Sequence, residues 1–243
     1  MFAIRHVPET GSTNDDATRL LGEAGSAGLV LAADHQTAGR GRRARGWIAP
    51  PGSSLLFTAI LPRTVATANL WAVPFWTALG VAEGIEQACG VRVDLQWPND
   101  LLLGGSKCCG ILCISRVAGE RAWTGCGVGL NVLRPAGDVA LAEVAPPPAF
   151  LSDRGPVERA PVLDAILAAF VRRLSELDAP EAVAREWERR GGLAGTRYRL
   201  LIDGSSEPFE AIAQRIAPDG GLVVSRDGAE QTIALADARV LRA

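Results

Sequence analysis

The chain has 243 residues, which is long for one ordinary domain and short for two, so we expect a main domain with a modest appendage. The 25 Lys and Arg nearly balance the 27 Asp and Glu, and the net charge of −2 excludes a global basic field for nucleic acid or anionic lipid. The 27 glycines, about 11% of the chain against an average of ~7%, indicate sites built from backbone.

The N-terminal half is expected to alternate short helices with buried strands. Ser12 or Thr13 is well placed to cap the first helix. In chain order, the pattern predicts a helix over 17–24, a strand over 29–33, a polar glycine-rich loop over 35–46, a strand over 54–61, a helix over about 70–89 with Pro74 in its first turn, and a strand over 91–97.

The middle of the chain has the pattern of antiparallel hairpins. Gly104 and Gly105 would turn the run 101–103 back into 108–115, and a second turn at Gly119 would lead into 122–132. Because these are hairpins rather than regular βαβ repeats, we predict an α+β fold with a mixed, largely antiparallel sheet and flanking helices.

The C-terminal part begins with two predicted helices, 161–177 and 180–190, each with Pro at its start. Glycines at 191, 192 and 195 mark the expected boundary between a main domain, 1–192, and a small domain, 193–243. Short β-like runs separated by Asp-Gly turns predict that the small domain is a β-barrel.

Several classes of protein are disfavoured by the remaining features. No secretory signal is readable over residues 1–8, so we expect a cytoplasmic protein. Residues 64–82 carry no charge, but their Thr, Asn and Pro favour a buried helix over a membrane span. The five cysteines are odd in number, which favours reduced thiols, and neither they nor the two histidines have metal-ligand spacing, so we expect no metal site.

The lysine content singles out one position. Of the 25 basic residues, 24 are Arg and only Lys107 is Lys. One explanation is a chance survivor. The other is that this position needs a compact point charge on a flexible stem, which a planar guanidinium does not imitate.

The loop over 39–46 places arginines between glycines. Gly39-Arg-Gly-Arg-Arg-Ala44 superficially matches a dinucleotide-binding fingerprint, but the residues that follow cannot open a helix, and the first downstream acid is Glu83. Arginines supply bidentate partners for phosphate or carboxylate, while glycines let the backbone approach a ligand. A solvated basic loop is the alternative, and glycine on both sides of Arg40 argues against it.

Five motifs in a fixed order identify a family. They are Gly11-Ser-Thr-Asn14, Gln36-Thr-Ala-Gly-Arg-Gly-Arg-Arg-Ala-Arg-Gly-Trp47, Trp97-Pro-Asn-Asp100, Lys107-Cys-Cys-Gly-Ile-Leu112 and Gly127-Val-Gly-Leu-Asn131. Together they resemble the biotin protein ligases. The resemblance is strong over about 1–133 and weaker to 192. Beyond residue 192 the resemblance rests only on position and pattern. The family has a main domain similar to class II synthetases, followed by a small SH3-like domain.

Two departures from the family pattern are visible. Cys108 and Cys109 follow the lysine where the family has small or aliphatic residues. The chain also begins almost at the first motif, which leaves no room for the winged helix-turn-helix of relatives that repress the biotin operon, so we expect no binding to nucleic acid.

The resemblance implies an enzyme that joins biotin to a lysine of a biotin carboxyl-carrier domain in a biotin-dependent carboxylase. Biotin and ATP would be its substrates, with Mg²⁺ accompanying ATP, and biotinyl-5'-AMP its intermediate. The carrier domain would be its partner, no membrane would be involved, and a homodimer is compatible with the resemblance. We expect the small C-terminal domain to be dispensable for binding biotin and to assist with ATP or the acceptor.

The resemblance also assigns the site residues. Its catalytic residues would be Lys107, Arg40, Arg42 and Asp100. Biotin would be bound by Ser12, Thr13, Asn14, Gln36, Gly39, Arg40, Gly41, Arg42, Lys107 and Gly110. The nucleotide would be bound by Arg42, Arg45, Trp47, Asn99, Lys107 and Asn131. Simpler alternatives remain for some of them: helix capping for Ser12 and Thr13, a core position for Trp47, and turn formation for Asp100 and Asn131.

Two other functions compete with this reading. A lipoate or octanoate ligase of the same superfold should lack both the arginine-glycine loop that ends in tryptophan and the Trp-Pro-Asn-Asp run. A non-catalytic biotin-binding module is the third reading, and the retained lysine at position 107 argues against it.

Overall fold

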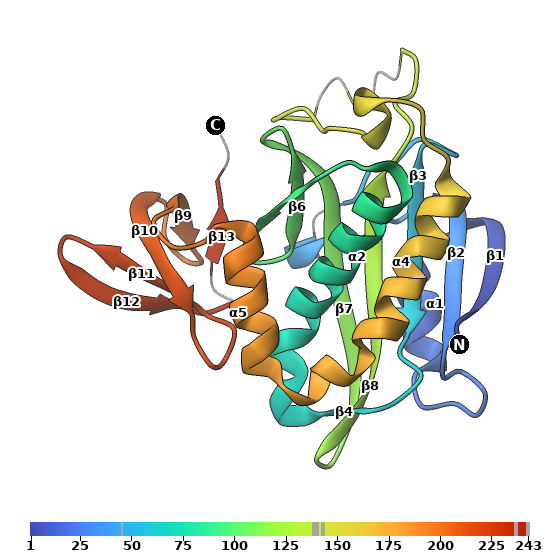
Figure 1. The fold of residues 1–243 in the computed structure, drawn as a ribbon, viewed down its shortest axis with the longest axis horizontal. Helices are drawn as coiled ribbons and strands as arrows, with labels where there is room; N and C mark the ends of the chain where they lie inside the picture. Colours follow the sequence, from blue (N-terminus) through green and yellow to red (C-terminus); the bar gives the residue numbers. More distant parts are fainter. Residues whose placement is uncertain (45, 138–140, 142–143, 236–237, 242–243) are drawn as a thin grey trace.

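A large mixed sheet forms the centre of the computed structural model, which describes residues 1–243 except 45, 138–140, 142–143, 236–237 and 242–243 (Figure 1). Seven of its eight strands lie in the order β1-β2-β3-β8-β7-β6-β5, and β4 pairs with β8. Only β1 and β2 are parallel among the described pairs, so the sheet is largely antiparallel, as predicted. The strands are β1 (Ala3–Thr10), β2 (Leu29–Gln36), β3 (Ser54–Ile60), β4 (Val65–Ala66), β5 (Asp94–Gln96), β6 (Asp100–Leu103), β7 (Ser106–Ala118) and β8 (Arg121–Asn131).

Helices cover both faces of this sheet. Helix α1 (Thr13–Leu20) lies on one face, and α2 (Val73–Cys89), α4 (Arg159–Arg173) and α5 (Pro180–Gly191) lie on the other (Figure 1). Strand β3 is buried along its whole length because it has helices on both sides. On β2, Val30 and Ala32 join the main core while Leu31 packs with α1, as the alternation of side chains along a strand requires.

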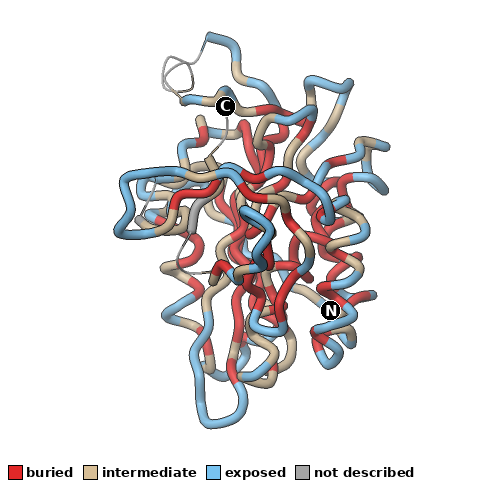
Figure 2. Tube along the Cα trace, turned by 90° about the vertical axis from the view of Figure 1, so that its left-hand side faces the viewer, coloured by how far each residue is buried: buried red, intermediate tan, exposed pale blue. Residues whose placement is uncertain are grey.

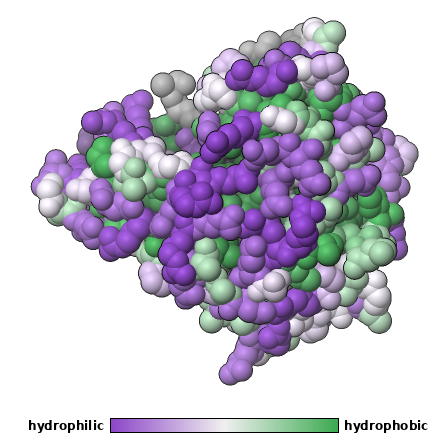
Figure 3. All heavy atoms as spheres, viewed as in Figure 1, coloured by the Kyte–Doolittle hydropathy of each residue, from purple (hydrophilic) through white to green (hydrophobic). Residues whose placement is uncertain are grey.

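The apolar residues lie mainly inside the molecule, between the sheet and the helices. Buried residues run through its middle, where strands and helices meet (Figure 2). Helix α2 is apolar almost all round because it lies between the sheet and α4. The outer face of the helices is mostly hydrophilic (Figure 3). Of the helices in the described residues, none combines the length and apolar character that a membrane crossing requires.

A second sheet follows α5. Its five strands lie in the order β12-β11-β10-β9-β13, and all four pairs are antiparallel. Its strands are β9 (Arg197–Ile202), β10 (Phe209–Ile216), β11 (Leu222–Arg226), β12 (Ala229–Ile233) and β13 (Ala238–Val240).

The two sheets share one hydrophobic core at a buried tryptophan. The indole N–H of Trp97 donates to the carbonyl of Gly220 at 3.2 Å, and its backbone N–H donates to the hydroxyl of Tyr198 at 3.3 Å. Trp97 is fully buried, and Tyr198 and Leu200 pack in the same core. The second sheet is therefore fixed against the segment that follows β5.

Most predicted elements are present, with shifted ends. The hairpin of β6 and β7, the following turn into β8, and Pro74 in the first turn of α2 are confirmed. Strand β1 was not predicted, the expected strand over 91–97 shortens to β5, and the helix expected over 161–177 is α4 followed by a 3-10 turn over Leu174–Asp178. Helix α1 begins earlier than expected, at Thr13. All five cysteines are free thiols.

Candidate active site

The candidate site is a cavity of about 350 Å³ on the face of the sheet opposite α2 and α4, large enough for a small organic ligand. Its floor is formed by β7 and β8. Its walls come from the start of α1, the arginine-glycine loop, the segment over 97–100, and the prolines at 146 and 148. Val240 of the second sheet also reaches the cavity.

Glycines open the floor of the cavity. Gly110 pairs directly with Gly129, and Leu112 with Gly127, so these four residues share one face of the β7-β8 ladder. A Cβ at Gly129 would lie 2.6 Å from the Trp47 ring, and a Cβ at Gly127 would lie 2.2 Å from the Asn14 amide oxygen. Side chains from the opposite wall can therefore lie directly on the strands.

An uncharged polar network forms the end of the cavity nearest α1. The backbone N–H and the hydroxyl of Thr13 both donate to Gln36 Oε1, at 2.8 and 3.1 Å. Asn14 Nδ2 donates to the carbonyl of Leu112 at 3.0 Å, and the Thr58 hydroxyl lies 2.7 Å from Asn14 Oδ1. Ser12, Thr13 and Asn14 are buried, so the wall here is rigid and carries no charge.

Helix capping does not account for Ser12. It occupies the N-cap position of α1, yet its side chain makes no capping hydrogen bond. Ser12 instead lines the cavity. The capping alternative for Ser12 is therefore wrong for its side chain, although the backbone conformation is that of an N-cap.

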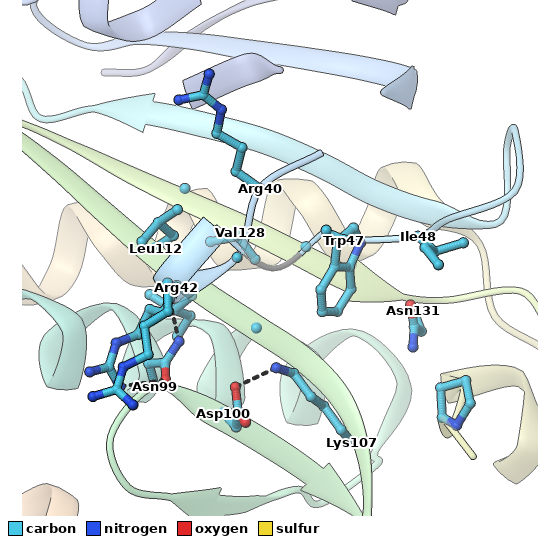
Figure 4. Close-up of a pocket in the computed structure, with 18 of the residues that line it drawn as sticks. Arg40, Arg42, Trp47, Ile48, Asn99, Asp100, Lys107, Leu112, Val128 and Asn131 are labelled. Atoms are coloured by element: carbon cyan, nitrogen blue, oxygen red, sulfur yellow. Dashed lines mark hydrogen bonds and ion pairs between the residues drawn. The ribbon is translucent and has the colours of Figure 1, made fainter. Parts of the chain in front are cut away.

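The other end of the cavity carries charge. Lys107 Nζ lies 2.6 Å from Asp100 Oδ1 and 5.4 Å from the centre of the Trp47 ring (Figure 4). The side chains of Lys107 and Asp100 are 30% and 15% exposed, so the pair is partly shielded from solvent. A Cβ at Gly110 would lie 3.2 Å from Lys107 Nζ, which shows how closely the ammonium lies against the strand.

The arginine-glycine loop crosses over the cavity, and its arginines point in different directions. Arg42 extends toward Asn99, with Nη1 donating to Asn99 Oδ1 at 3.4 Å (Figure 4). Arg40 points away from Lys107, and its guanidinium lies 3.0 Å from a carboxylate oxygen of Asp15 (Figure 4). The geometry therefore brings Arg42 to the charged end, while Arg40 would have to leave Asp15 to reach it.

Two asparagines hold the edges of the site. Asn99 Nδ2 donates to the carbonyl of Ile111 at 2.6 Å, which ties the segment after Trp97 to β7. Asn131 ends β8, where its Oδ1 accepts from Ser54 and its Nδ2 donates to the carbonyl of Ala149 at 3.2 Å. Each amide keeps further hydrogen-bonding capacity toward the cavity.

Almost all residues expected at the site line this one cavity. Gly39 does not line it; its carbonyl accepts from the Trp47 backbone N–H at 2.9 Å, and a Cβ on it would lie 2.6 Å from the Trp47 carbonyl. Gly39 therefore closes the base of the loop. Arg45 lies outside the described residues. The expected residues found on the wall are Ser12, Thr13, Asn14, Gln36, Arg40, Gly41, Arg42, Trp47, Asn99, Asp100, Lys107, Gly110 and Asn131.

Sequence reasoning missed parts of the wall. Gly127 and Gly129 belong to the fifth motif, and the family resemblance assigns no role to them, although alternating glycines in a strand signal close backbone approach. Thr58 does not line the cavity, but its hydroxyl hydrogen-bonds to the wall residues Thr13 and Asn14. It gave no signal, because threonine is an ordinary residue in an apolar strand. The apolar contacts of Leu112 and Val128 were also missed.

The cysteines beside Lys107 are not activated nucleophiles. Burial raises the pKa of the Cys108 thiol to about 12. Burial, followed by the neighbouring Cys108, raises the pKa of Cys109 well above its ordinary value. Both thiols therefore stay protonated near neutral pH and act as small apolar core residues.

Comparisons with known proteins identify the relatives of this chain. Residues 8–131 match the model of the Biotin/lipoate A/B protein ligase family. The bifunctional ligase/repressor BirA of Bacillus subtilis is 32% identical over 167 residues, and the chain spans half the length of that relative. The biotin–[acetyl-CoA-carboxylase] ligase of Paracoccus denitrificans is 32% identical over 240 residues, which cover 94% of this chain and 96% of the relative.

A solved structure shares the fold. The biotin protein ligase from Aquifex aeolicus, solved in complex with biotin and ATP, superimposes with a TM-score of 0.78 over the whole of both chains, at 22% sequence identity. The match to the family model over half of the chain and the end-to-end likeness to the Paracoccus protein lead to the same conclusion: the chain belongs to the Biotin/lipoate A/B protein ligase family.

Proposed function

We propose that this chain is a biotin–[biotin carboxyl-carrier protein] ligase. The observation that carries the proposal is the division of one cavity into two chemical ends. One end pairs the single lysine of the chain with Asp100, and the other is buried, polar and uncharged. A ligand with a neutral polar head and a carboxylate at the end of an apolar chain fits both.

The uncharged end suits the ureido head of biotin. A ureido group offers one acceptor and two N–H donors, and Ser12, Thr13, Asn14 and Gln36 supply both kinds of partner in a dry pocket. The glycines of β7 and β8 leave a slot over the strands for the rest of the ligand, with Trp47 as its cover. The same polar end argues against a lipoate or octanoate ligase, since an aliphatic tail would bury these polar side chains without offering them a hydrogen bond.

At the charged end, two substrates must be joined although both are negative. A carboxylate oxygen of biotin attacks the α-phosphorus of ATP, the bond to the bridging oxygen breaks, and pyrophosphate leaves. We expect Lys107 and Arg42 to neutralise the charge that gathers there, with Lys107 following the carboxylate as it becomes a mixed anhydride. Mg²⁺ would arrive with ATP, held by the triphosphate.

Asp100 would act in both steps. In this structure it holds Lys107 at 2.6 Å, so it sets the position of the ammonium before substrates bind. In the second step the amine of the acceptor lysine attacks the acyl carbon, AMP leaves, and the nitrogen loses a proton. Among the described residues that line the cavity, Asp100 has the only carboxylate, and we propose that it orients that amine and accepts the proton.

The nucleotide would lie between the loop and the end of β8. Trp47 offers a ring face, and Asn99 and Asn131 offer amides at the cavity wall. Arg40 would join the phosphates after leaving Asp15. Arg45 is proposed for the nucleotide on the family pattern alone. A boundary near Gly192 and an SH3-like character for the second sheet are also proposed; the strand that begins at Arg197 after the end of α5 supports the boundary.

The test is transfer of biotin to a purified carrier domain. The protein is incubated with biotin, Mg-ATP and a biotin carboxyl-carrier domain, and the acceptor is probed with streptavidin. A carrier domain whose acceptor lysine is replaced by arginine is the matched control. Label on the wild-type acceptor only is expected. Transfer of octanoate or lipoate with no transfer of biotin would overturn the proposal.

A further inference from the structure

Two neighbouring arginines of the loop over the cavity contact residues that lie between strands of the second sheet. Arg42 donates to the backbone carbonyl of Leu235. Arg43 Nη1 lies 2.7 Å from Asp203 Oδ1, in the turn between β9 and β10. Loop and turn are far apart in the sequence, so the ion pair is a purely tertiary contact.

The Arg43 end of this ion pair is constrained by its backbone. Arg43 has φ 59 and ψ 43, the left-handed region that residues other than glycine seldom adopt. Its side chain is 21% exposed, whereas that of Asp203 is 61% exposed. A partner that fixes the guanidinium therefore also favours the unusual bend, which lies directly after Arg42.

Asp203, at the other end of the pair, directly follows the last residue of β9. Strands β9 and β10 belong to the sheet that Trp97 joins to the main core through the Gly220 carbonyl and the Tyr198 hydroxyl. Trp97 immediately precedes the segment that carries Asn99 and Asp100. The carboxylate of Asp203 thus has a defined position relative to the charged end of the cavity, even though it lies outside the cavity.

We propose that Asp203 is a positioning residue: its ion pair with Arg43 holds the arginine-glycine loop in the bent course that places Arg42 and Trp47 over the cavity. The second sheet thereby sets how well the nucleotide is held. The consequence for ATP rests on the proposed function, whereas the consequence for the loop does not. The uncharged end of the cavity is held together without this loop, through Thr13, Gln36 and Asn14, so loss of Asp203 should affect ATP binding more than biotin binding.

The first test measures the loop without any substrate. Trypsin cleaves after arginine, and the loop carries arginines at 40, 42, 43 and 45. Asp203→Asn should raise the cleavage rate at these positions about fivefold, the change that a partly exposed ion pair can supply. Glu210→Gln is the matched control, because Glu210 pairs with Arg197 at 2.9 Å in the same sheet without contacting the loop.

The second test measures enzyme kinetics in the full-length protein. Asp203→Asn should raise the KM for ATP about fivefold and change kcat and the KM for biotin by less than about twofold. The reversed pair, Arg43→Glu with Asp203→Arg, should restore the KM for ATP and the rate of cleavage after Arg40, a site that this exchange leaves in place. Cleavage of Asp203→Asn at the rate of Glu210→Gln would overturn the proposal. Slow cleavage in the wild type and fast cleavage in Asp203→Asn would support the role of Asp203 in holding the loop, even if the protein transferred no biotin.

Discussion

Replacing Lys107 by arginine keeps the positive charge and changes its shape. The ammonium lies 2.6 Å from Asp100 Oδ1, under the Trp47 ring, and 3.2 Å from the point where a Cβ on Gly110 would lie. This space admits a compact cation on a flexible stem. A planar guanidinium placed there must displace Trp47 or leave Asp100, and it cannot follow a carboxylate as the charge moves onto the phosphate.

The expected loss is large because the interaction strengthens in the transition state. We expect Lys107→Arg to slow adenylate formation by about two orders of magnitude or more, on the order of 3 kcal/mol of transition-state stabilisation. Biotin affinity should fall less, since the uncharged end of the cavity is unchanged. Lys107→Met, which removes the charge, should slow adenylate formation at least as much.

The assay is pyrophosphate release with biotin and ATP in the absence of acceptor, set beside calorimetric titration of biotin into the same variants. Near-normal release by Lys107→Arg would refute the reasoning, because charge alone would then be sufficient. In that case the single lysine of the chain would be an accident of its composition.

Three further outcomes are expected. Gly129→Ala should weaken biotin binding by at least tenfold in calorimetry, because its Cβ would lie 2.6 Å from Trp47, whereas Gly11→Ala should not, since nothing lies within 4 Å of its Cβ. The hydrogen bond from Arg159 keeps the pKa of Asp34 below its usual 3.8. The ionised Asp34 therefore stabilises the folded protein fully above pH 3.8, and this contribution is lost as the pH falls through the lower pKa of the folded state. The Tm difference between wild type and Asp34→Asn should be constant above about pH 5 and shrink below about pH 4. Burial raises the pKa of Cys108 to about 12, so this thiol should resist iodoacetamide at pH 8 in the native protein and react after denaturation. Labelling is followed by mass spectrometry, and rapid labelling of the native protein would contradict the burial of Cys108.

Sequence patterns were most informative where chemistry and turns are local. Glycine turns located the hairpins of β6, β7 and β8, and the five motifs located most of the cavity wall. The motifs do not include Pro146, Pro148 or Val240, which also line the cavity. Strand β1 escaped prediction because it is an exposed edge strand with little apolar alternation. The direction of the Arg40 side chain could not be predicted either. It is set by the ion pair with Asp15, and the two residues come together only in the folded chain.

The attachment of the second sheet to the main core was also beyond the sequence. A boundary near Gly192 suggested a domain that could be removed without loss of biotin binding. Trp97, however, takes hydrogen-bond partners from Tyr198 and Gly220, and the cores of the two sheets are continuous. Removing 193–243 would expose Trp97 beside Asn99 and Asp100, so we expect such a truncation to disturb the cavity itself. Contacts of this kind join residues that no local pattern links.

The most direct test of the central claim is exchange of labelled pyrophosphate into ATP in the absence of any acceptor. If the cavity forms biotinyl-5'-AMP, exchange depends on biotin, is not supported by octanoate or lipoate, and is lost in Lys107→Arg. Exchange that octanoate or lipoate supports and biotin does not, or the absence of exchange by a protein that binds biotin in calorimetry, would contradict the assignment of this site.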